Sequence, residues 1–320
     1  MEKILEKIES TGIVPVIKID QVEDAVPLAH ALLEGGLPIM EVTFRTDCAK
    51  EAIERISREV PEMLVGAGTV LTTEQVDQAI EAGAKFIVSP GLNEKVVSYC
   101  QQKRTMILPG CANPSDVEKA IELGLKVVKF FPAEAAGGLK MIKAMAAPYS
   151  GVRFMPTGGI SEKNLNEYLA FDKIIACGGS WMVTPELIAS KDFDKITELT
   201  KEAVKTMLGF EFDHVGINTE DEEDAVNTAR RFKDLFGSDV NKGNSSIFVN
   251  SEVEVVKGKG KGACGHIAYR TRDLKRAIAY LEKQGYAIDY TTVKYNAKKK
   301  AIAVYLSKEI NDFAIHLIQK

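Results

Sequence analysis

Short apolar runs alternate with amphipathic helical patterns from the N-terminus to about residue 208. Each run has mainly β-branched or aromatic residues and ends in Gly, Pro, Ser or Thr, which is typical of a buried parallel strand. The eight predicted strands occupy 13–19, 38–44, 63–70, 85–90, 105–110, 125–132, 152–159 and 173–180. This alternation predicts an α/β fold, a compact (β/α)8 TIM barrel, with an open doubly wound sheet as the alternative.

Polar residues mark the starts of several helices between these runs. Thr72 with Gln75, and Asp20 with Glu23, have the spacing of a capping box. Asn113 precedes a proline and is suited to cap a helix whose first residue is that proline. We therefore expect helices to begin close to these three positions.

The regular alternation of apolar runs and helical patterns ends at about residue 208. The tail contains two units of roughly 50 residues, each with a strand, a helix and further strands, and together they form an internal repeat. Strands are predicted at 212–217, 245–249, 253–256, 264–269, 286–293, 301–306 and 313–318, and helices at 221–236 and 273–284. The sequence thus predicts two domains, a barrel over 1–208 and a smaller α+β domain over 209–320.

Composition excludes several classes of protein. The chain has 41 Lys and Arg against 45 Asp and Glu, a formal charge of −4, which argues against a general nucleic-acid binder. Its five cysteines are scattered and form no CxxC pair, as in ordinary cytosolic proteins. No stretch approaches 18 apolar residues, and the charged N-terminus lacks the apolar core of a signal peptide. We therefore expect a soluble, cytoplasmic protein without membrane partners.

The second predicted strand carries polar residues on one face. Period-2 alternation places Glu41, Thr43 and Arg45 on the face opposite an apolar one. Barrel enzymes build their active sites at the C-terminal ends of the strands, toward which this face becomes more polar. The alternative is a structural ion pair between Glu41 and Arg45, since a buried charge is costly unless it is paired.

Lys129 lies within the almost wholly apolar sixth strand. Lysine is rarely buried, and burial lowers the pKa of an amine toward neutrality. A neutral amine is the nucleophile that forms a Schiff base with a carbonyl. The alternative is a lysine whose ammonium group extends from the strand end into water.

Two glycine pairs follow the seventh and eighth strands. Gly158 and Gly159 come after the former, and Gly178 and Gly179 with Ser180 come after the latter. Glycine lets backbone N–H groups approach an anion, and these two loops commonly form the phosphate site of a barrel. Their positions favour phosphate binding, although either pair alone would be an ordinary turn.

Six motifs in a fixed order make the first 208 residues similar to the 2-dehydro-3-deoxy-phosphogluconate (KDPG) and 4-hydroxy-2-oxoglutarate (KHG) aldolase family. The motifs are Met40–Thr46, Gly66–Val70, Ser89–Gly91, Val128–Glu134, Pro156–Ile160 and Gly178–Trp181. The resemblance implies a class I, Schiff-base aldolase that acts without a metal, and it implies a homotrimer. The implied substrates are KDPG or its C4 epimer and KHG, between which the sequence does not decide.

The resemblance also assigns roles to residues. Lys129 corresponds to the Schiff-base lysine and Glu41 to the general acid/base, and Arg45 and Thr69 correspond to the groups that bind the substrate carboxylate. The other implied contacts are Pro90, Phe131 and Thr157 in the pocket and Gly158, Gly159, Gly179 and Ser180 around the phosphate.

The tail weakly resembles the vicinal oxygen chelate, or glyoxalase-like, superfamily, which is built from paired βαβββ modules. The metal-ligand positions of that superfamily correspond to His214, Glu254, His266 and His316, the last with histidine in place of the usual acid. The resemblance implies a divalent metal in the tail. The histidine substitution and a short first module favour the alternative, a metal-free pocket or a packed sheet interface.

Three function hypotheses remain open. The first is a metal-free lyase whose tail packs, oligomerises or binds a regulatory small molecule. The second is a bifunctional enzyme with a metal-dependent, glyoxalase-type activity in the tail. The third, a binding protein on an inactive barrel, is disfavoured because every implied catalytic residue is present.

Overall fold

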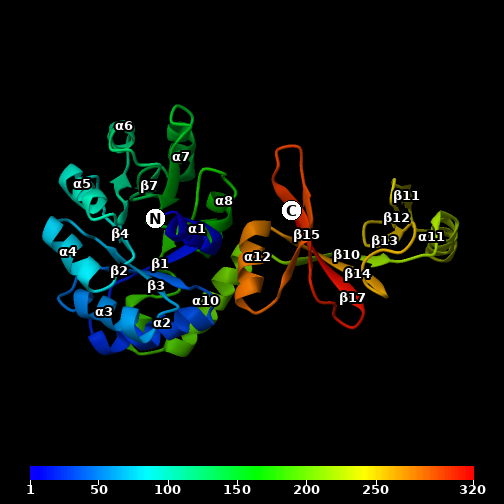
Figure 1. The fold of residues 1–320 in the computed structure, drawn as a ribbon, viewed down its shortest axis with the longest axis horizontal. Coiled ribbons are helices and arrows are strands. Elements are labelled where there is room, and N and C mark those ends of the chain that lie inside the picture. Colours follow the sequence, from blue (N-terminus) through cyan, green and yellow to red (C-terminus); the bar gives the residue numbers. More distant parts are fainter. The chain divides into compact units, whose positions relative to one another are not determined.

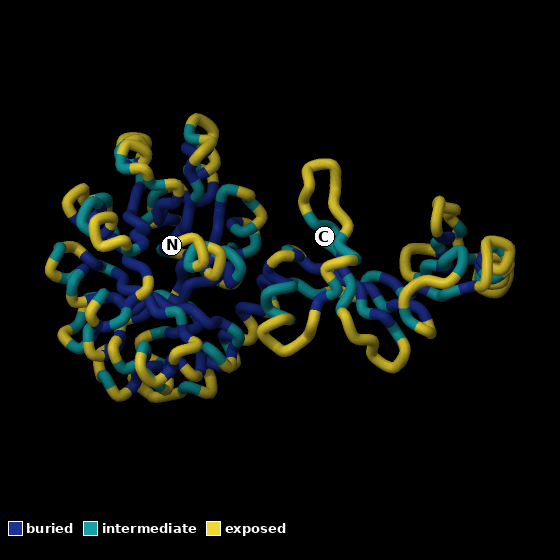
Figure 2. Tube along the Cα trace, in the orientation of Figure 1, coloured by how far each residue is buried: buried dark blue, intermediate teal, exposed yellow.

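The computed structural model describes residues 1–320, which divide into two compact units, 1–207 and 208–320 (Figure 1). Within the N-terminal unit the strands are largely buried, whereas the helices have exposed outer turns (Figure 2). No helix of the structure combines the length and the apolar character needed to cross a bilayer.

The N-terminal unit contains a strand in each of the eight predicted runs. These strands are β1 (Ile13–Ile17), β2 (Ile39–Thr43), β3 (Leu64–Gly68), β4 (Phe86–Val88), β5 (Met106–Leu108), β6 (Gly110–Cys111), β7 (Val127–Phe130), β8 (Arg153–Pro156) and β9 (Cys177–Gly179). The fifth run is divided into β5 and β6 by Pro109, which has no N–H to donate to a neighbouring strand. Its carbonyl still accepts the Lys129 N–H at 2.9 Å.

Parallel pairing joins these strands into a barrel-like ring. One sheet has the order β5-β4-β3-β2-β1-β9, and a second has the order β6-β7-β8. Only Pro109 separates β5 from β6, and bridges of Thr157 with Gly178 and of Phe154 with Ile174 join the two sheets on the other side. The pairing favours this ring over an open doubly wound sheet, which would leave two free edges.

Helices follow the strands around the N-terminal unit. They are α1 (Glu2–Thr11), α2 (Ala25–Glu34), α3 (Ala49–Glu59), α4 (Thr73–Glu81), α5 (Glu94–Gln102), α6 (Pro114–Glu122), α7 (Gly138–Ala146), α8 (Glu162–Leu169), α9 (Pro185–Ala189) and α10 (Phe193–Leu208). Helix α1 packs Ile4, Leu5 and Ile8 against apolar side chains at the beginnings of the strands, among them Ile39 and Phe86. The N-terminal end of the ring is therefore filled with apolar side chains.

Two of the three predicted helix caps form. The Thr72 hydroxyl accepts the Gln75 N–H at 3.2 Å, and the Asn113 side chain accepts the Asp116 N–H at 3.0 Å. The prediction for Asp20 is wrong: it forms an ion pair with Lys18 at 2.7 Å, and a 3₁₀ turn, Val22–Asp24, precedes α2. Pro27 explains the late start, because proline is tolerated only in the first turn of a helix.

The C-terminal unit consists of two strand–helix–three-strand modules. The first contains β10 (Glu211–Ile217), α11 (Glu222–Phe236), β11 (Val240–Lys242), β12 (Ser246–Val249) and β13 (Val253–Val256). The second contains β14 (Gly265–Thr271), α12 (Leu274–Lys283), β15 (Ile288–Tyr295), β16 (Ala301–Leu306) and β17 (Phe313–Gln319). The sequence missed β11, a strand of three residues, so the first module is complete although short.

The two modules share one eight-stranded sheet with the order β11-β12-β13-β10-β14-β17-β16-β15. In each module the first strand pairs in parallel with the last, and the two first strands pair antiparallel at the centre. One face of β12 and β13 packs Ile247, Val249 and Val255 against Ala225 and Ala229 of α11. Because side chains alternate along a strand, the other face of these strands carries Phe248 and Glu254.

Candidate functional site

Glu41 and Lys129 form a buried ion pair inside the N-terminal unit. Glu41, on β2, is fully buried, and Lys129, on β7, is 5% exposed. The Lys129 Nζ lies 3.5 Å from Glu41 Oε1 and 5.1 Å from the centre of the Phe131 ring. Neither carboxylate oxygen of Glu41 has a hydrogen-bond partner. The structure thus places Lys129 in the interior rather than in water, and Glu41 pairs with it rather than with Arg45.

The end of β3 provides the space for Glu41. A Cβ atom at Gly68 would lie 2.1 Å from Glu41 Oε1 and 2.7 Å from its Cγ. The next residue, Thr69, has a φ of 56°, a left-handed backbone conformation that residues other than glycine rarely adopt. Such strain is concentrated at functional sites. Gly68 was not assigned a role from the sequence, although it belongs to the Gly66–Val70 motif.

Arg45 is held by the hydroxyl group of Thr43, the last residue of β2. Its Nε donates to Thr43 Oγ1 at 3.2 Å, and the Thr43 hydroxyl donates to the Ile17 carbonyl of β1 at 2.9 Å. Thr43 is buried, whereas Arg45 is exposed just beyond the end of β2. The guanidinium group is therefore anchored at one nitrogen, and its terminal nitrogens can bind a carboxylate in a bidentate manner.

The loops after β8 and β9 lie side by side. Thr157 forms a bridge with Gly178, and its buried hydroxyl oxygen lacks a hydrogen-bond partner. A Cβ at Gly178 would lie 2.3 Å from that oxygen. Gly158 and Gly159 have φ values of 100° and 80°, which only glycine adopts readily. Both loops therefore require glycine.

The remaining predicted residues are partly exposed or surround these loops. Pro90 and Phe131 are half-buried, Gly179 is buried and Ser180 is exposed. A Cβ at Gly179 would lie 2.0 Å from the Trp181 ring, so that ring packs directly on the glycine backbone. Tyr168 of α8 donates a hydrogen bond to Glu134, and the Glu134 N–H donates to the Gly158 carbonyl at 3.0 Å. The Tyr168–Glu134 contact, missed in the sequence, joins α8 to the loop after β7, and the Glu134–Gly158 bond joins that loop to the glycine loop after β8.

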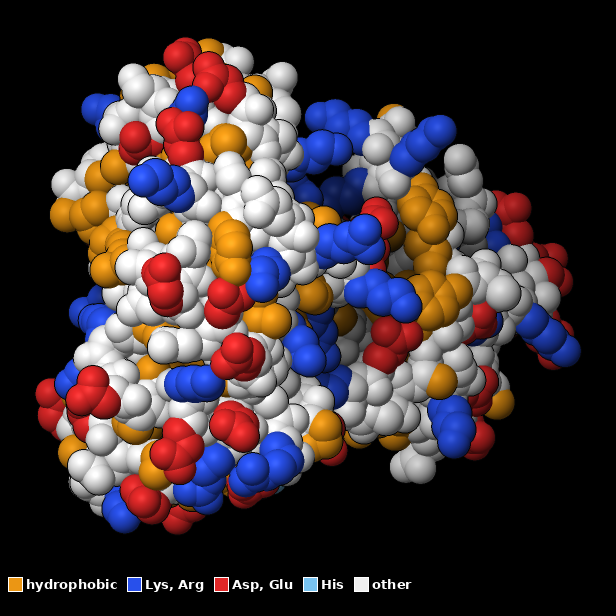
Figure 3. Space-filling view, turned by 60° about the vertical axis from the view of Figure 1, so that its left-hand side comes forward, with side chains coloured by type: hydrophobic (Ala, Val, Ile, Leu, Met, Phe, Trp, Pro, Cys, Tyr) orange, Lys and Arg blue, Asp and Glu red, His pale blue; other side chains and the backbone are white.

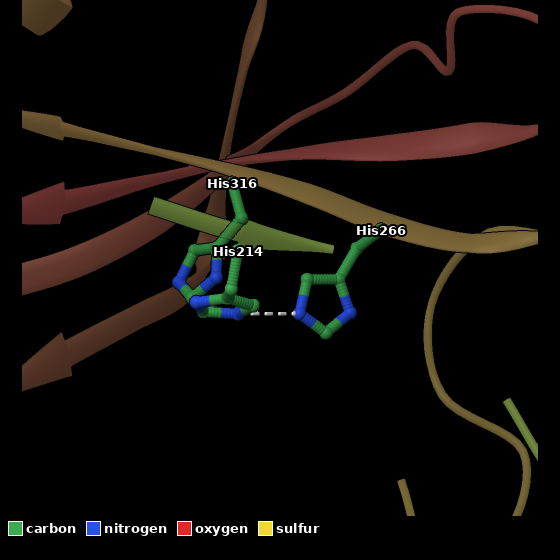
Figure 4. A group of neighbouring side chains, drawn as sticks. All are labelled: His214, His266 and His316. Atoms are coloured by element: carbon green, nitrogen blue, oxygen red, sulfur yellow. Dashed lines mark hydrogen bonds between the residues drawn. The ribbon is translucent and has the colours of Figure 1, made fainter. Parts of the chain in front are cut away.

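Three histidines and one glutamate converge in the C-terminal unit. His214, His266 and His316 come from β10, β14 and β17, and ring nitrogens of the three lie within 4.8 Å of one another (Figure 4). His214 Nε2 is 3.0 Å from His266 Nε2, and each of these atoms is 3.1 Å from Glu254 Oε2 of β13. The structure therefore brings together all four residues that the sequence indicated.

Burial and neighbouring charges set the ionisation of this cluster. Burial alone would lower the pKa of His214, but hydrogen bonds to Glu254 and Asp213 outweigh it and raise the pKa. Burial and the neighbouring histidines lower the pKa of His316 to about 4. His316 is 8% exposed, both of its ring nitrogens lack hydrogen-bond partners, and its ring stacks on Tyr305 with centroids 4.4 Å apart. It is thus a neutral, unpartnered imidazole within a cluster of potential ligands.

Comparisons with known proteins match the N-terminal unit. The profile of the family described as "KDPG and KHG aldolase" matches residues 4–199. The 2-dehydro-3-deoxy-phosphogluconate aldolase of Treponema pallidum is 51% identical over 205 residues, which cover 64% of this chain and 98% of that protein.

Two solved structures are also similar to this chain. The 2-keto-3-deoxy-6-phosphogluconate aldolase of Zymomonas mobilis, solved with 3-phosphoglycerate, is 45% identical with a TM-score of 0.59, covering 63% of this chain and 93% of that one. The KDPG aldolase of Legionella pneumophila, solved with pyruvate as a covalent carbinolamine, is 40% identical with a TM-score of 0.60, covering 62% and 96%.

These matches define the N-terminal unit as an aldehyde-lyase with an α/β fold. The chain belongs to the KDPG and KHG aldolase family. The family expected from the six sequence motifs is thus confirmed. The C-terminal unit lies outside the matched residues 4–199.

The space at Gly68 yields a prediction. Gly68→Ala forces the Glu41 carboxylate away from Lys129, because the new methyl group occupies its position. We expect the aldolase kcat to fall by about 10- to 100-fold, as for a misplaced catalytic group, with little change in melting temperature. Gly151→Ala is the matched control, since a Cβ there meets nothing within 4 Å. Unchanged kcat in Gly68→Ala would show that Glu41 needs no defined position.

Proposed function

We propose that the N-terminal unit cleaves KDPG to pyruvate and glyceraldehyde 3-phosphate, and KHG to pyruvate and glyoxylate, through a Schiff base on Lys129. The observation that carries the proposal is the buried Lys129–Glu41 pair, in which an amine and an unsolvated carboxylate lie 3.5 Å apart. A neighbouring carboxylate can take a proton from the amine, which must be neutral to attack a carbonyl. Family membership supports the same reaction.

The proposed reaction uses these two groups in turn. The Lys129 amine adds to the C2 carbonyl to give a carbinolamine. Glu41 then passes the proton that it took from the amine to the departing hydroxyl, so that loss of water gives a protonated imine and restores the carboxylate. The C3–C4 bond breaks and its electron pair forms an enamine, while the C4 hydroxyl proton passes to Glu41. Glu41 returns that proton to C3, and water then hydrolyses the imine, which releases pyruvate and regenerates the amine. Because the imine itself is the electron sink, this chemistry needs no metal.

Substrate orientation is assigned to the groups at the ends of β2 and β3. Arg45, held at Nε by Thr43, and Thr69, in its strained conformation, bind the substrate carboxylate. A bidentate guanidinium contact fixes the C2 carbonyl next to the amine and so lowers the entropic part of the barrier. We also assign Pro90, Phe131 and Thr157, whose hydroxyl has no hydrogen-bond partner, to the lining of the pocket.

The phosphate is assigned to the paired loops after β8 and β9. Gly158 and Gly159 precede helix α8, Gly179 is the last residue of β9 and Ser180 follows it. Backbone N–H groups near a helix N-terminus favour an anion, and Ser180 adds an exposed hydroxyl. KHG has no phosphate and would leave these loops unused. The same groups also suit the C4 epimer of KDPG, so preference between the epimers rests on the shape of the pocket.

We further assign residues 1–208 as a (β/α)8 barrel and residues 209–320 as a glyoxalase-like domain of paired βαβββ modules. Strand pairing around the ring and the duplicated strand order support these assignments. The family resemblance supports a homotrimer. Free, scattered cysteines support a cytoplasmic location. The formal charge of −4 suits small-molecule partners better than nucleic acid, and acidic and basic side chains are interspersed over the left-hand part of the face drawn in Figure 3.

The Schiff base is tested by trapping. Borohydride added with pyruvate is expected to inactivate the enzyme and to attach a reduced pyruvyl group to the peptide that contains Lys129, as read by mass spectrometry. Lys129→Met should remain unlabelled. Lys126→Met, which removes an exposed lysine three residues earlier, should be labelled like the wild type. An adduct on another residue, or no adduct, would exclude Lys129 as the nucleophile.

Glu41→Gln tests the proton transfer. The substitution keeps the shape of the side chain but removes its base, so turnover should fall by roughly 10²- to 10⁴-fold with the fold intact. Glu34→Gln is the control, because it removes an exposed carboxylate that pairs with Lys201. Steady-state kinetics on KDPG supply the measurement. Turnover within a few-fold of the wild type would make Glu41 a structural residue.

A second candidate function belongs to the C-terminal unit: we propose a metal-dependent, glyoxalase-type enzyme or a small-molecule-binding regulatory module. His214, His266 and Glu254 would hold a divalent ion, with His316 as a fourth ligand. Their three atoms are 3.0–3.1 Å apart, the separation of neighbouring ligands around an octahedral ion with bonds of about 2.1 Å. Imidazole and carboxylate ligands suit Mn, Fe, Co, Ni or Zn. Such an ion would polarise a bound oxygen.

Metal content tests the candidate centre. Elemental analysis of the full chain, purified without a histidine tag, should give close to one Mn, Fe, Co, Ni or Zn per chain. The variant His214→Ala/His266→Ala should lose it. His30→Ala, which removes the fourth, exposed histidine of the chain, should retain it. A wild-type content below about 0.1 per chain, with no rise in melting temperature on adding Zn, Ni or Mn, would refute the centre.

A further inference from the structure

Asp213 lies beside the histidine cluster because of an irregularity in β10. Phe212 pairs with Tyr269 of β14, but the next pair joins His214 to Ala268, so Asp213 is an extra residue on its strand. A β-bulge of this kind places two successive residues opposite one and redirects a side chain. In a regular strand Asp213 and His214 would point to opposite faces. Here both side chains lie on the face that carries the cluster.

The bulge brings the Asp213 carboxylate to Nδ1 of the His214 ring, whereas Nε2 of that ring faces His266. Asp213 Oδ2 lies 2.6 Å from His214 Nδ1, and the Asp213 side chain is only 8% exposed. The guanidinium group of Arg270, on β14, forms an ion pair with the other carboxylate oxygen. A carboxylate can only accept a hydrogen bond, so Nδ1 of this ring carries a proton whatever the state of Nε2. His214 Nε2 is thereby directed at His266 and Glu254.

We propose that Asp213 is the positioning residue of the C-terminal cluster: it fixes the tautomer and the orientation of His214 and so sets the affinity of the cluster for a divalent metal ion. This inference rests on the proposed metal centre. A carboxylate that is hydrogen-bonded to the ring nitrogen not bound to the metal orients the histidine ring and makes it a stronger ligand. Arg270 holds the carboxylate in place from the adjacent strand.

The two modules differ at this position, so the orienting carboxylate is specific to the first module. His266 corresponds to His214 in the repeat, and the residue before it is Gly265 rather than an aspartate. Gly265 has a φ of 109°, and a Cβ there would lie 1.9 Å from the Gly216 carbonyl oxygen. The second module therefore has no room for a carboxylate at the equivalent position. His214 is the histidine of the cluster that is oriented by a neighbouring acid in its own strand.

The test compares metal affinity in Asp213→Ala and Asp213→Asn with that of the full wild-type chain. Titrations of Mn²⁺, Ni²⁺ and Zn²⁺ against a chromophoric chelator give the dissociation constants. Asp213→Ala should weaken binding by about 10- to 100-fold. Asp213→Asn should weaken it less, because its amide oxygen still accepts the Nδ1 hydrogen. Glu211→Gln, which removes an exposed carboxylate of the same strand that pairs with Lys320, should leave affinity unchanged.

A second measurement follows the His214 ring in metal-free protein. Nitrogen-15 NMR of the histidine rings, recorded at a pH where the His214 ring is neutral, should show a proton on Nδ1 and none on Nε2 of His214 in the wild type and in Asp213→Asn. In Asp213→Ala this preference should be lost. A purely structural Asp213 would change stability without changing the tautomer. Tm values of all variants identify any that fail to fold, and Asp213→Asn then carries the comparison.

The outcomes separate this inference from the proposed centre. If the wild type binds metal and Asp213→Ala binds it equally well, the positioning role is wrong while the centre stands. An Nδ1 proton that is unaffected by Asp213→Ala would also overturn it. If the wild type binds none of the three ions, the centre itself fails, and the affinity role of Asp213 fails with it. Weaker binding together with a changed tautomer supports the inference.

Discussion

The buried ion pair between Lys129 and Glu41 is the constraint on which the N-terminal unit depends. Two charges removed from water carry a desolvation cost that their mutual attraction offsets only with favourable geometry. At 3.5 Å, with both carboxylate oxygens free of other hydrogen bonds, the pair is not optimised for stability. Removing one partner would leave the other group buried without its ion-pair partner. The surrounding structure must therefore tolerate the pair and hold it in place.

The barrel-like ring accommodates this ion pair because the two ends of its strands are built differently. At the beginnings of the strands, α1 and the first residues of several strands form a continuous apolar cluster. This burial supplies the stability that a polar interior lacks, at roughly 25 cal/mol per Å² of apolar surface. At the other end, Gly68, Gly178 and Gly179 leave the space into which Glu41, Thr157 and Trp181 extend. The glycines of the motifs thus make room for neighbouring side chains as well as for a ligand.

The sequence predicts the elements of both units well, because periodicity and turn residues are local signals. It failed at Asp20, where Pro27 delays the helix, and at β11, where three residues give too weak a pattern. Contacts across the ring were only partly predictable. Strand alternation put Glu41, Thr43 and Arg45 on one face, but only the fold shows that Glu41 meets Lys129 and that Thr43 anchors Arg45.

Register sets a further limit on what sequence can predict. His214 and Asp213 are adjacent, and alternation would place them on opposite faces. The bulge that overrides this depends on pairing with β14, more than 50 residues away in the chain. A sheet built from duplicated modules can therefore acquire an asymmetric site without any change in its strand order. The first module contributes an oriented histidine and a carboxylate, Glu254, whereas the second contributes His266 and His316.

This asymmetry has an electrostatic consequence. Neutral imidazoles add no charge, so Glu254 is the only charged ligand among the four. A divalent ion held by that set would keep one net positive charge, whereas a second carboxylate in place of His316 would cancel it. A residual positive charge in a partly desolvated site strengthens the attraction for an anionic ligand, because the effective dielectric constant there is low. His316, where the resemblance of the tail implies an acid, is therefore compatible with a metal site and would favour a more negatively charged ligand there.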